Sequence, residues 1–173
     1  MGIKQINGGY VAAEDRILLR VSTDADEEFR FWLTRPVTSH LLAANRTIAA
    51  RIVAEKFPPQ IAQTVTEFEQ QAVAQQTRLD DQFVPGASFP LGEAPALVVK
   101  ITLTPVENGV SFDLGMPNGV NVNLKIAHQL AQQVGVLLDR LQNDAKWMIA
   151  PAGVQSPPEA SANADDGEKK LVH

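Results

Sequence analysis

The chain has 173 residues, 45 % of them hydrophobic, which suits one domain of roughly 100–150 residues with its own core and a tail. The net charge of −5 argues against an obligate binder of duplex DNA, because such a protein needs a basic face. The chain contains no cysteine, which excludes disulfides, thiolate catalysis and thiolate metal sites.

The first part of the chain predicts extended structure. Residues 3–13 are expected to be extended, with a turn at Gly8-Gly9. Residues 16–22 alternate apolar and polar side chains, as a strand does. Residues 28–34 alternate in the same way, and the short polar loop before them favours antiparallel pairing with residues 16–22. The side chains of this second strand expected to face the core are Phe29, Phe31 and Leu33.

A long amphipathic helix is predicted after Pro36, a residue that suits the first turn of a helix. Its apolar residues recur every three or four positions, and it is expected to end before Pro58-Pro59. A second helix is expected over residues 60–78, with a glutamine-rich face and weak packing. Residues 79–95 are rich in proline and glycine and predict a connecting loop. The apolar stripes contain Val37, Leu41, Ala44, Ile48 and Ile52 in the first helix and Ile61, Val65, Phe68 and Ala72 in the second.

The second half of the chain predicts another sheet. Residues 96–104 alternate like a strand, and Asn108-Gly109 is a strong hairpin signal. Residues 110–114 are expected to continue the sheet. Residues 120–124 form a short strand with one apolar and one amide face, which is typical of a sheet edge.

The last helix is expected over residues 125–146, with Trp147 as an anchor at its end. From residue 150 onward large apolar side chains are almost absent, so residues 150–173 are expected to be a disordered tail. The apolar stripe of the helix contains Leu130, Val134, Leu137, Leu138 and Leu141.

Together these elements predict an α+β fold in which antiparallel sheets are packed by long amphipathic helices. We expect residues 1–149 to form one domain with two strand–strand–helix halves, residues 1–78 and 96–149, joined by the loop 79–95. This repeated plan resembles the general plan of Whirly-type folds, which bind single-stranded nucleic acid. The resemblance is one of architecture and implies the fold only.

The clearest candidate binding residues lie on the outward face of the first hairpin. Arg16, Arg20, Arg30 and Trp32 share this face, and Arg35 follows nearby. A basic face with an exposed aromatic ring can stack a base and hold a phosphate, so it predicts a site for single-stranded nucleic acid.

A structural interpretation of the same face stays open. Trp32 can lie beneath a helix or pack across the sheet, and the arginines can pair with neighbouring carboxylates. The carboxylates close enough in sequence are Glu14, Asp15 and Glu28.

Motifs for catalysis and metal binding are weak. His40 and His128 lie on predicted helices without a partner at helical spacing, so no metal site and no cofactor are expected. Ser39 lacks the glycines of a nucleophile elbow, and no glycine-rich phosphate loop occurs. Together these absences argue against an enzyme but leave that question open.

Three functions follow from these patterns. The favoured one is a non-enzymatic intracellular protein-interaction or scaffold module that forms homodimers through edge elements at residues 60–78 and 120–124. The alternative is binding of single-stranded nucleic acid through the arginine and tryptophan face. A second alternative is a small-ligand binder or enzyme whose site, involving His40 or His128, forms only on folding. No stretch is long and apolar enough to span a membrane, so a cytoplasmic location is expected.

Overall fold

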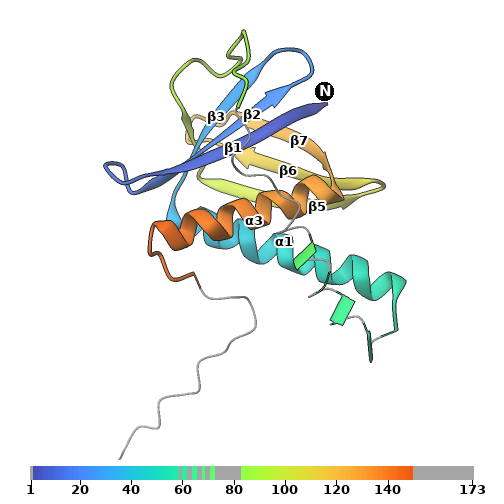
Figure 1. Ribbon diagram of the computed structural model, residues 1–173. Helices are drawn as coiled ribbons and strands as arrows, with labels where there is room; N and C mark the ends of the chain where they lie inside the picture. The colour runs from blue at the N-terminus through green and yellow to red at the C-terminus, as the bar shows by residue number, and fades with distance from the viewer. Residues whose placement is uncertain are drawn as a thin grey trace, which may run out of the picture.

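The protein has an α+β fold, built from two sheets and two long helices, α1 and α3, in a computed structural model (Figure 1). The fold class predicted from the sequence is confirmed. The structure describes residues 2–58, 60–61, 64–65, 68, 71–72 and 83–149. The expected tail and the start of the connecting loop, residues 79–82, lie outside the described residues.

The first sheet has the strand order β1-β2-β3-β4, and the second has the order β5-β6-β7. All neighbouring strands are antiparallel except β3 and β4, which are parallel. Helix α1 follows β3, and α3 follows β7. The bounds are β1 Ile3–Val11, β2 Arg16–Thr23, β3 Glu28–Leu33, α1 Arg35–Lys56, β4 Ala96–Leu97, β5 Lys100–Val106, β6 Gly109–Gly115, β7 Asn121–Ala127 and α3 His128–Asp144.

The predicted hairpin of β2 and β3 is confirmed, with Arg20 opposite Arg30 and Val21 opposite Phe29. Because alternate side chains point to opposite faces of a strand, this register separates a core face from an outer face. The outer face of the first sheet is the one that carries Arg20, Glu28, Arg30 and Trp32. Its core face is buried, and its β2 and β3 members are Ile17, Leu19, Val21, Phe29, Phe31 and Leu33.

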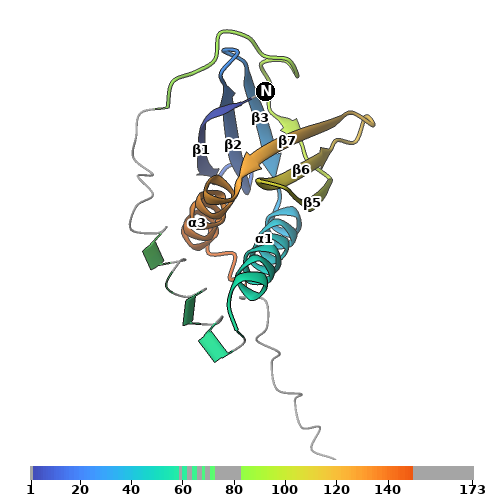
Figure 2. The same ribbon diagram turned by 90° about the vertical axis from the view of Figure 1, so that its right-hand side faces the viewer.

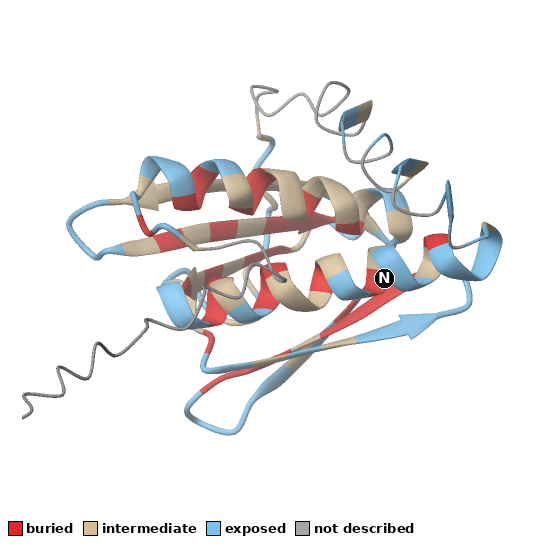
Figure 3. Ribbon diagram, turned by 90° about the horizontal axis from the view of Figure 1, so that it is seen from below, coloured by how far each residue is buried: buried red, intermediate tan, exposed pale blue. Residues whose placement is uncertain are grey.

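The two helices run antiparallel, side by side, beneath both sheets (Figures 1 and 2). Asn45 Nδ2 donates to the Ala131 carbonyl at 2.8 Å, and Arg46 pairs with Asp139 at 2.6 Å. A Cβ at Gly135 would lie 2.6 Å from Asn45 Nδ2, so a side chain there would displace the Asn45 amide from its present position. Figure 3 shows the buried positions as bands along the helices and strands.

Both halves of the chain contribute to one hydrophobic core. Phe31 and Leu42 come from the first half, and Val110, Phe112 and Leu138 come from the second; all five are buried. The chain crosses from one sheet to the other next to the buried Val98, whose N–H donates to the Trp32 carbonyl at 3.0 Å. The halves are therefore packed together rather than independent.

Three local predictions are wrong. The Gly8-Gly9 turn does not exist, because β1 is continuous through both residues. A side chain at Gly8 would lie 3.0 Å from Leu141 Cδ1, so the glycine gives α3 room to pack on β1. Each half contains three main strands before its helix instead of two. The single strand expected over residues 96–104 is divided between β4 and β5.

The boundary between β7 and α3 also differs from the prediction. The strand continues to Ala127 and the helix begins at His128, whereas the sequence predicted a change after Leu124. Ile126 pairs opposite Val110 and is buried, which explains why the strand continues. The described residues between 60 and 72 are helical, as predicted, and Ile61 and Phe68 are exposed there, which fits the weak packing expected.

Candidate functional site

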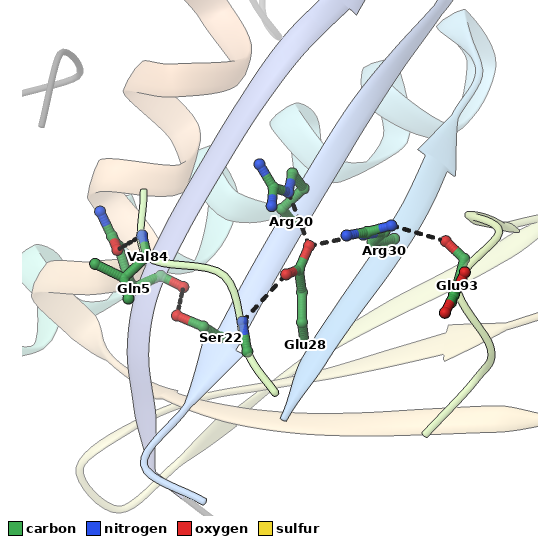
Figure 4. A network of polar contacts seen from close by, with 8 residues as sticks. Gln5, Arg20, Ser22, Glu28, Arg30, Val84 and Glu93 are labelled. Carbon is green, nitrogen blue, oxygen red and sulfur yellow. Dashed lines mark hydrogen bonds and ion pairs between the residues drawn. The ribbon is translucent and has the colours of Figure 1, made fainter. Parts of the chain in front are cut away.

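The outer face of the first sheet is organised around the buried carboxylate of Glu28 (Figure 4). Its Oε1 accepts from Arg20 Nε at 2.8 Å and from Arg30 Nε at 2.7 Å. Its Oε2 accepts from the backbone N–H of Gly86 at 3.2 Å. The Glu28 side chain is fully covered, whereas the two arginine side chains keep 24 % and 26 % of their surface exposed. We call Glu28, Arg20, Arg30 and Gly86 the Glu28 cluster.

The arginines explain why a carboxylate is stable in this covered position. Burial alone would raise the pKa of Glu28, but hydrogen bonds from Arg20 and Arg30, together with their charges, outweigh that effect. The pKa of Glu28 therefore lies below its ordinary value of 4.5. Glu28 thus offsets one of the two positive charges that Arg20 and Arg30 bring to the predicted binding face.

A segment from far along the chain, residues 83–95, lies over this face; we call it the strap. Phe83 covers the Arg20 guanidinium at 4.0 Å, and Phe89 covers the Arg30 guanidinium at 4.4 Å. Arg30 also donates to the Glu93 carbonyl at 3.0 Å, as Figure 4 shows. The strap therefore occupies the guanidinium faces that an aromatic ligand would use.

The strap is also fixed through its backbone. The Glu28 N–H donates to the Ser88 carbonyl at 2.8 Å, and the Val84 N–H donates to Gln5 Oε1 at 3.1 Å. A side chain at Gly86 would meet the backbone of Glu27 at 2.6 Å, so only glycine lets the strap approach this closely. The strap is the part of this face that sequence reasoning missed. Its aromatic residues and Gly86 were the available signals.

The other residues of the predicted binding face, Arg16, Trp32 and Arg35, do not take part in the Glu28 cluster. Arg16 pairs with Glu14 at 3.5 Å. Trp32 is half-buried on the outer face, opposite Leu18 in the register of the strands. Arg35 is exposed at the start of α1. The structure thus brings Arg20 and Arg30 together and leaves Arg16 and Arg35 at the margin.

A second polar cluster joins the β1–β2 turn to the end of α3. Asp15 Oδ1 accepts from the Tyr10 hydroxyl at 2.9 Å and from Trp147 Nε1 at 2.8 Å. These hydrogen bonds, with that from Trp147 the larger effect, lower the pKa of Asp15, and the bond to Asp15 raises the pKa of Tyr10. Trp147 is buried, so its predicted anchoring position is confirmed.

The two histidines in the described part of the chain, His40 and His128, do not converge on one site. His40 is exposed on α1, whereas His128 lines a cavity of about 310 Å³ between α1 and the first turn of α3. Ile48 and Val110 supply apolar walls, and no acidic residue lines the cavity within the described part of the chain. His128 Nδ1 is buried without a hydrogen-bond partner among the described residues. The cavity therefore lacks the histidine–carboxylate pairing that general acid–base catalysis would use.

Metal and membrane features are also absent from the described residues. No group of three or more His, Asp or Glu side chains there has the geometry to hold a metal ion. Within the same ranges, neither long helix is apolar enough to cross a lipid bilayer.

The edge strand predicted at residues 120–124 corresponds to β7, which begins at Asn121 and lies at an edge of the second sheet. Asn121, Asn123, Lys125 and Ala127 are exposed along it. The edge position and the amide-rich outer face agree with the sequence.

In comparisons with known proteins, no family model, no curated protein and no solved structure matches this chain.

Proposed function

We propose that this protein is a self-associating interaction module in which two copies pair through the edges of their β7 strands. The observation that carries this proposal is the open edge of β7. The strand is seven residues long, and within the described part of the chain its only neighbour in the sheet is β6. Among the described residues, no turn, loop or cap hydrogen bond reaches the backbone of residues 121–126, which pair only with β6. An unpaired row of backbone groups is a template for another strand.

The other sheet edges carry features that discourage pairing, and β7 does not. Edge strands are commonly protected by proline, glycine, bulges, charge or short length. Strand β1 has an irregular register between Ile3 and Gln5, β5 contains Pro105, and β4 has two residues. Strand β7 has no proline, no glycine and no bulge, and its only charged residue is Lys125. This contrast favours β7 as the interface.

The sequence of β7 is compatible with pairing to its own copy. The centre of the strand is Leu124, and a two-fold axis there gives the longest antiparallel overlap. Asn123 would then face Lys125 of the second copy, and Asn121 would face Ala127. No like charges oppose each other in this register, which matters because opposed like charges destabilise a sheet. The two sheets would join into one sheet of six strands, three from each copy.

Apolar surface beside the strand supports the same interface. Val120, immediately before β7, is 41 % exposed, and Val122 on its core face is only half-buried. A strand added at this edge would cover part of both side chains. We also propose that the protein forms this dimer in the cytoplasm, the location expected from the sequence.

Sedimentation velocity over a range of protein concentrations tests the proposal. We expect the parent protein to form a dimer and Asn123→Lys to be monomeric, because the new lysine would face Lys125 of the second copy. Within one copy the new side chain lies beside Asp113, to which Asn123 now donates, so the fold should be kept.

Thr102→Lys is the matched control. Thr102 also pairs opposite Asp113, but on β5, and it is exposed. The substitution adds the same positive charge next to the same residue, Asp113, but on the strand of this sheet that lies farthest from the proposed interface. A parent protein that stays monomeric at every concentration would refute the proposal, and so would equal dimerisation of both lysine variants.

A further inference from the structure

The strap is attached to the first sheet without being part of its core. None of residues 83–95 is fully buried. Its contacts with the sheet are hydrogen bonds and two aromatic rings on guanidinium groups, and the half-buried Leu91 also packs against the hydrophobic core. Segments with few buried apolar contacts open locally at low cost, while the rest of the structure stays folded. Opening of the strap would therefore remove one half-buried side chain, Leu91, from the core and leave the fully buried residues in place.

The rings of the strap occupy positions suited to stacked bases. Arg20 and Arg30 are direct cross-strand neighbours, so their side chains lie next to each other on one face. Each guanidinium plane is covered by a phenyl ring, Phe83 or Phe89. Nucleobases stack on arginine planes in the same way when proteins bind single strands.

Charge on the uncovered face fits the same ligand. Glu28 offsets one of the two arginine charges of the cluster, so Arg20 and Arg30 leave a net positive charge that a phosphate can use. Trp32 follows Arg30 on the same face and adds a further aromatic surface, and Arg35 is exposed beyond it. The backbone N–H of Gly86, now bonded to Glu28, leaves together with the strap.

From these observations we infer that the strap is an internal cover over a site for single-stranded nucleic acid, with Phe83 and Phe89 in the places of two stacked bases. In the closed protein the rings compete with the ligand for the two guanidinium planes, whereas Glu28, which belongs to β3, offsets one arginine charge whether the strap is closed or open. Opening the strap frees two neighbouring guanidinium planes. This inference concerns a different surface from the β7 edge and is independent of self-association.

The test measures binding of a short fluorescein-labelled oligothymidylate by fluorescence anisotropy at several salt concentrations. The double variant Phe83→Ala/Phe89→Ala removes both half-buried rings and leaves every core residue in place. We expect it to bind at least about tenfold more tightly than the parent, with an affinity that falls as salt rises. Val84→Ala, which trims an exposed strap side chain, should bind like the parent.

Two further variants keep the test decisive. Gly86→Ala retains both rings but prevents the strap from approaching β3, so it should release the strap, give faster hydrogen exchange at the Ser88 amide and show the same gain in affinity. Adding Arg20→Lys and Arg30→Lys to the double variant keeps the charges that pair with Glu28 but removes the planar groups, so the gain should disappear.

The inference is overturned if the double variant or a released Gly86→Ala strap binds no more tightly than the parent. It is also overturned if the two lysine substitutions leave the gain intact, or if the parent binds equally well while its strap amides remain protected.

Discussion

Replacing Glu28 by alanine is the most informative perturbation of the first sheet. The change leaves three donors, from Arg20, Arg30 and Gly86, without their acceptor. It also leaves two guanidinium groups side by side on neighbouring strands without a carboxylate between them. The expected result is a clear loss of stability together with release of the strap.

The size of the loss follows from how much of the cluster is covered. Removing one partner of a buried ion pair costs roughly 3–5 kcal/mol. The arginine side chains are 24 % and 26 % exposed, so water compensates part of this loss, and we expect about 2–4 kcal/mol. For a domain of this size the melting temperature should fall by roughly 6–12 °C.

The pH dependence gives an independent check on the same residue. Because the pKa of Glu28 in the folded protein lies below 4.5, its contribution is complete above that pH and is lost as the pH falls through the folded-state pKa. The difference in melting temperature between the parent and Glu28→Ala should therefore be constant near neutral pH and shrink in acid. Asp15, whose pKa is also lowered, is present in both proteins and cancels from the difference.

Calorimetry of the parent, Glu28→Ala and Glu28→Gln as a function of pH is the assay. Glutamine keeps an acceptor for the arginines but loses the charge, so it should fall between the other two near neutral pH and show no acid-dependent change of its own. A Glu28→Ala protein that melts within about a degree of the parent at neutral pH would refute the reasoning. So would a difference that persists unchanged in acid.

Two other predictions concern the packing of α3. Asp15→Ala should lower the melting temperature and shift the indole N–H resonance of Trp147 in NMR spectra, because that N–H loses its acceptor, whereas Asp15→Asn should largely keep both values. Gly8→Val should destabilise the protein by about 1–3 kcal/mol in denaturant titrations, because its side chain would collide with Leu141; Gly9→Val, at a position with no atom nearby, should cost much less.

Local pattern was enough to predict the central elements. Strict alternation in residues 16–22 and 28–34 gave the first hairpin, because one face had to be buried. Pro36 at the start and Pro58 beyond the end correctly limited the first helix. These predictions depend on neighbours within a few residues, which is the range that periodicity reports.

The incorrect predictions depend on tertiary contacts. Gly8 was interpreted as a turn residue, but its role is to give space to Leu141 from α3, which sequence spacing does not reveal. The end of β7 was placed too early because Lys125 and His128 interrupt the apolar pattern, whereas pairing of Ile126 with Val110 extends the strand. A partner strand decided the boundary in place of local propensity.

In the candidate site, too, the features set by local pattern were predicted and those set by tertiary contacts were not. The outward position of Arg20 and Arg30 followed from alternation, and Glu28 was recognised as a possible partner. The covering of both arginines by Phe83 and Phe89 could not be predicted, because the strap is separated from them by the whole of α1 and the segment that follows it. Loops carry no periodic signal that reports where they dock.

Cross-linking between copies tests the central claim, pairing of β7 with β7, most directly. The chain has no cysteine, so a single introduced thiol is unique. An equimolar mixture of Asn123→Cys and Lys125→Cys proteins, both changed at exposed positions, should oxidise to a covalent heterodimer, since these positions face each other across the proposed two-fold axis. Thr102→Cys, mixed with either variant, should remain uncoupled. Failure of the 123–125 pair to cross-link, or equal cross-linking through position 102, would contradict the proposed dimer.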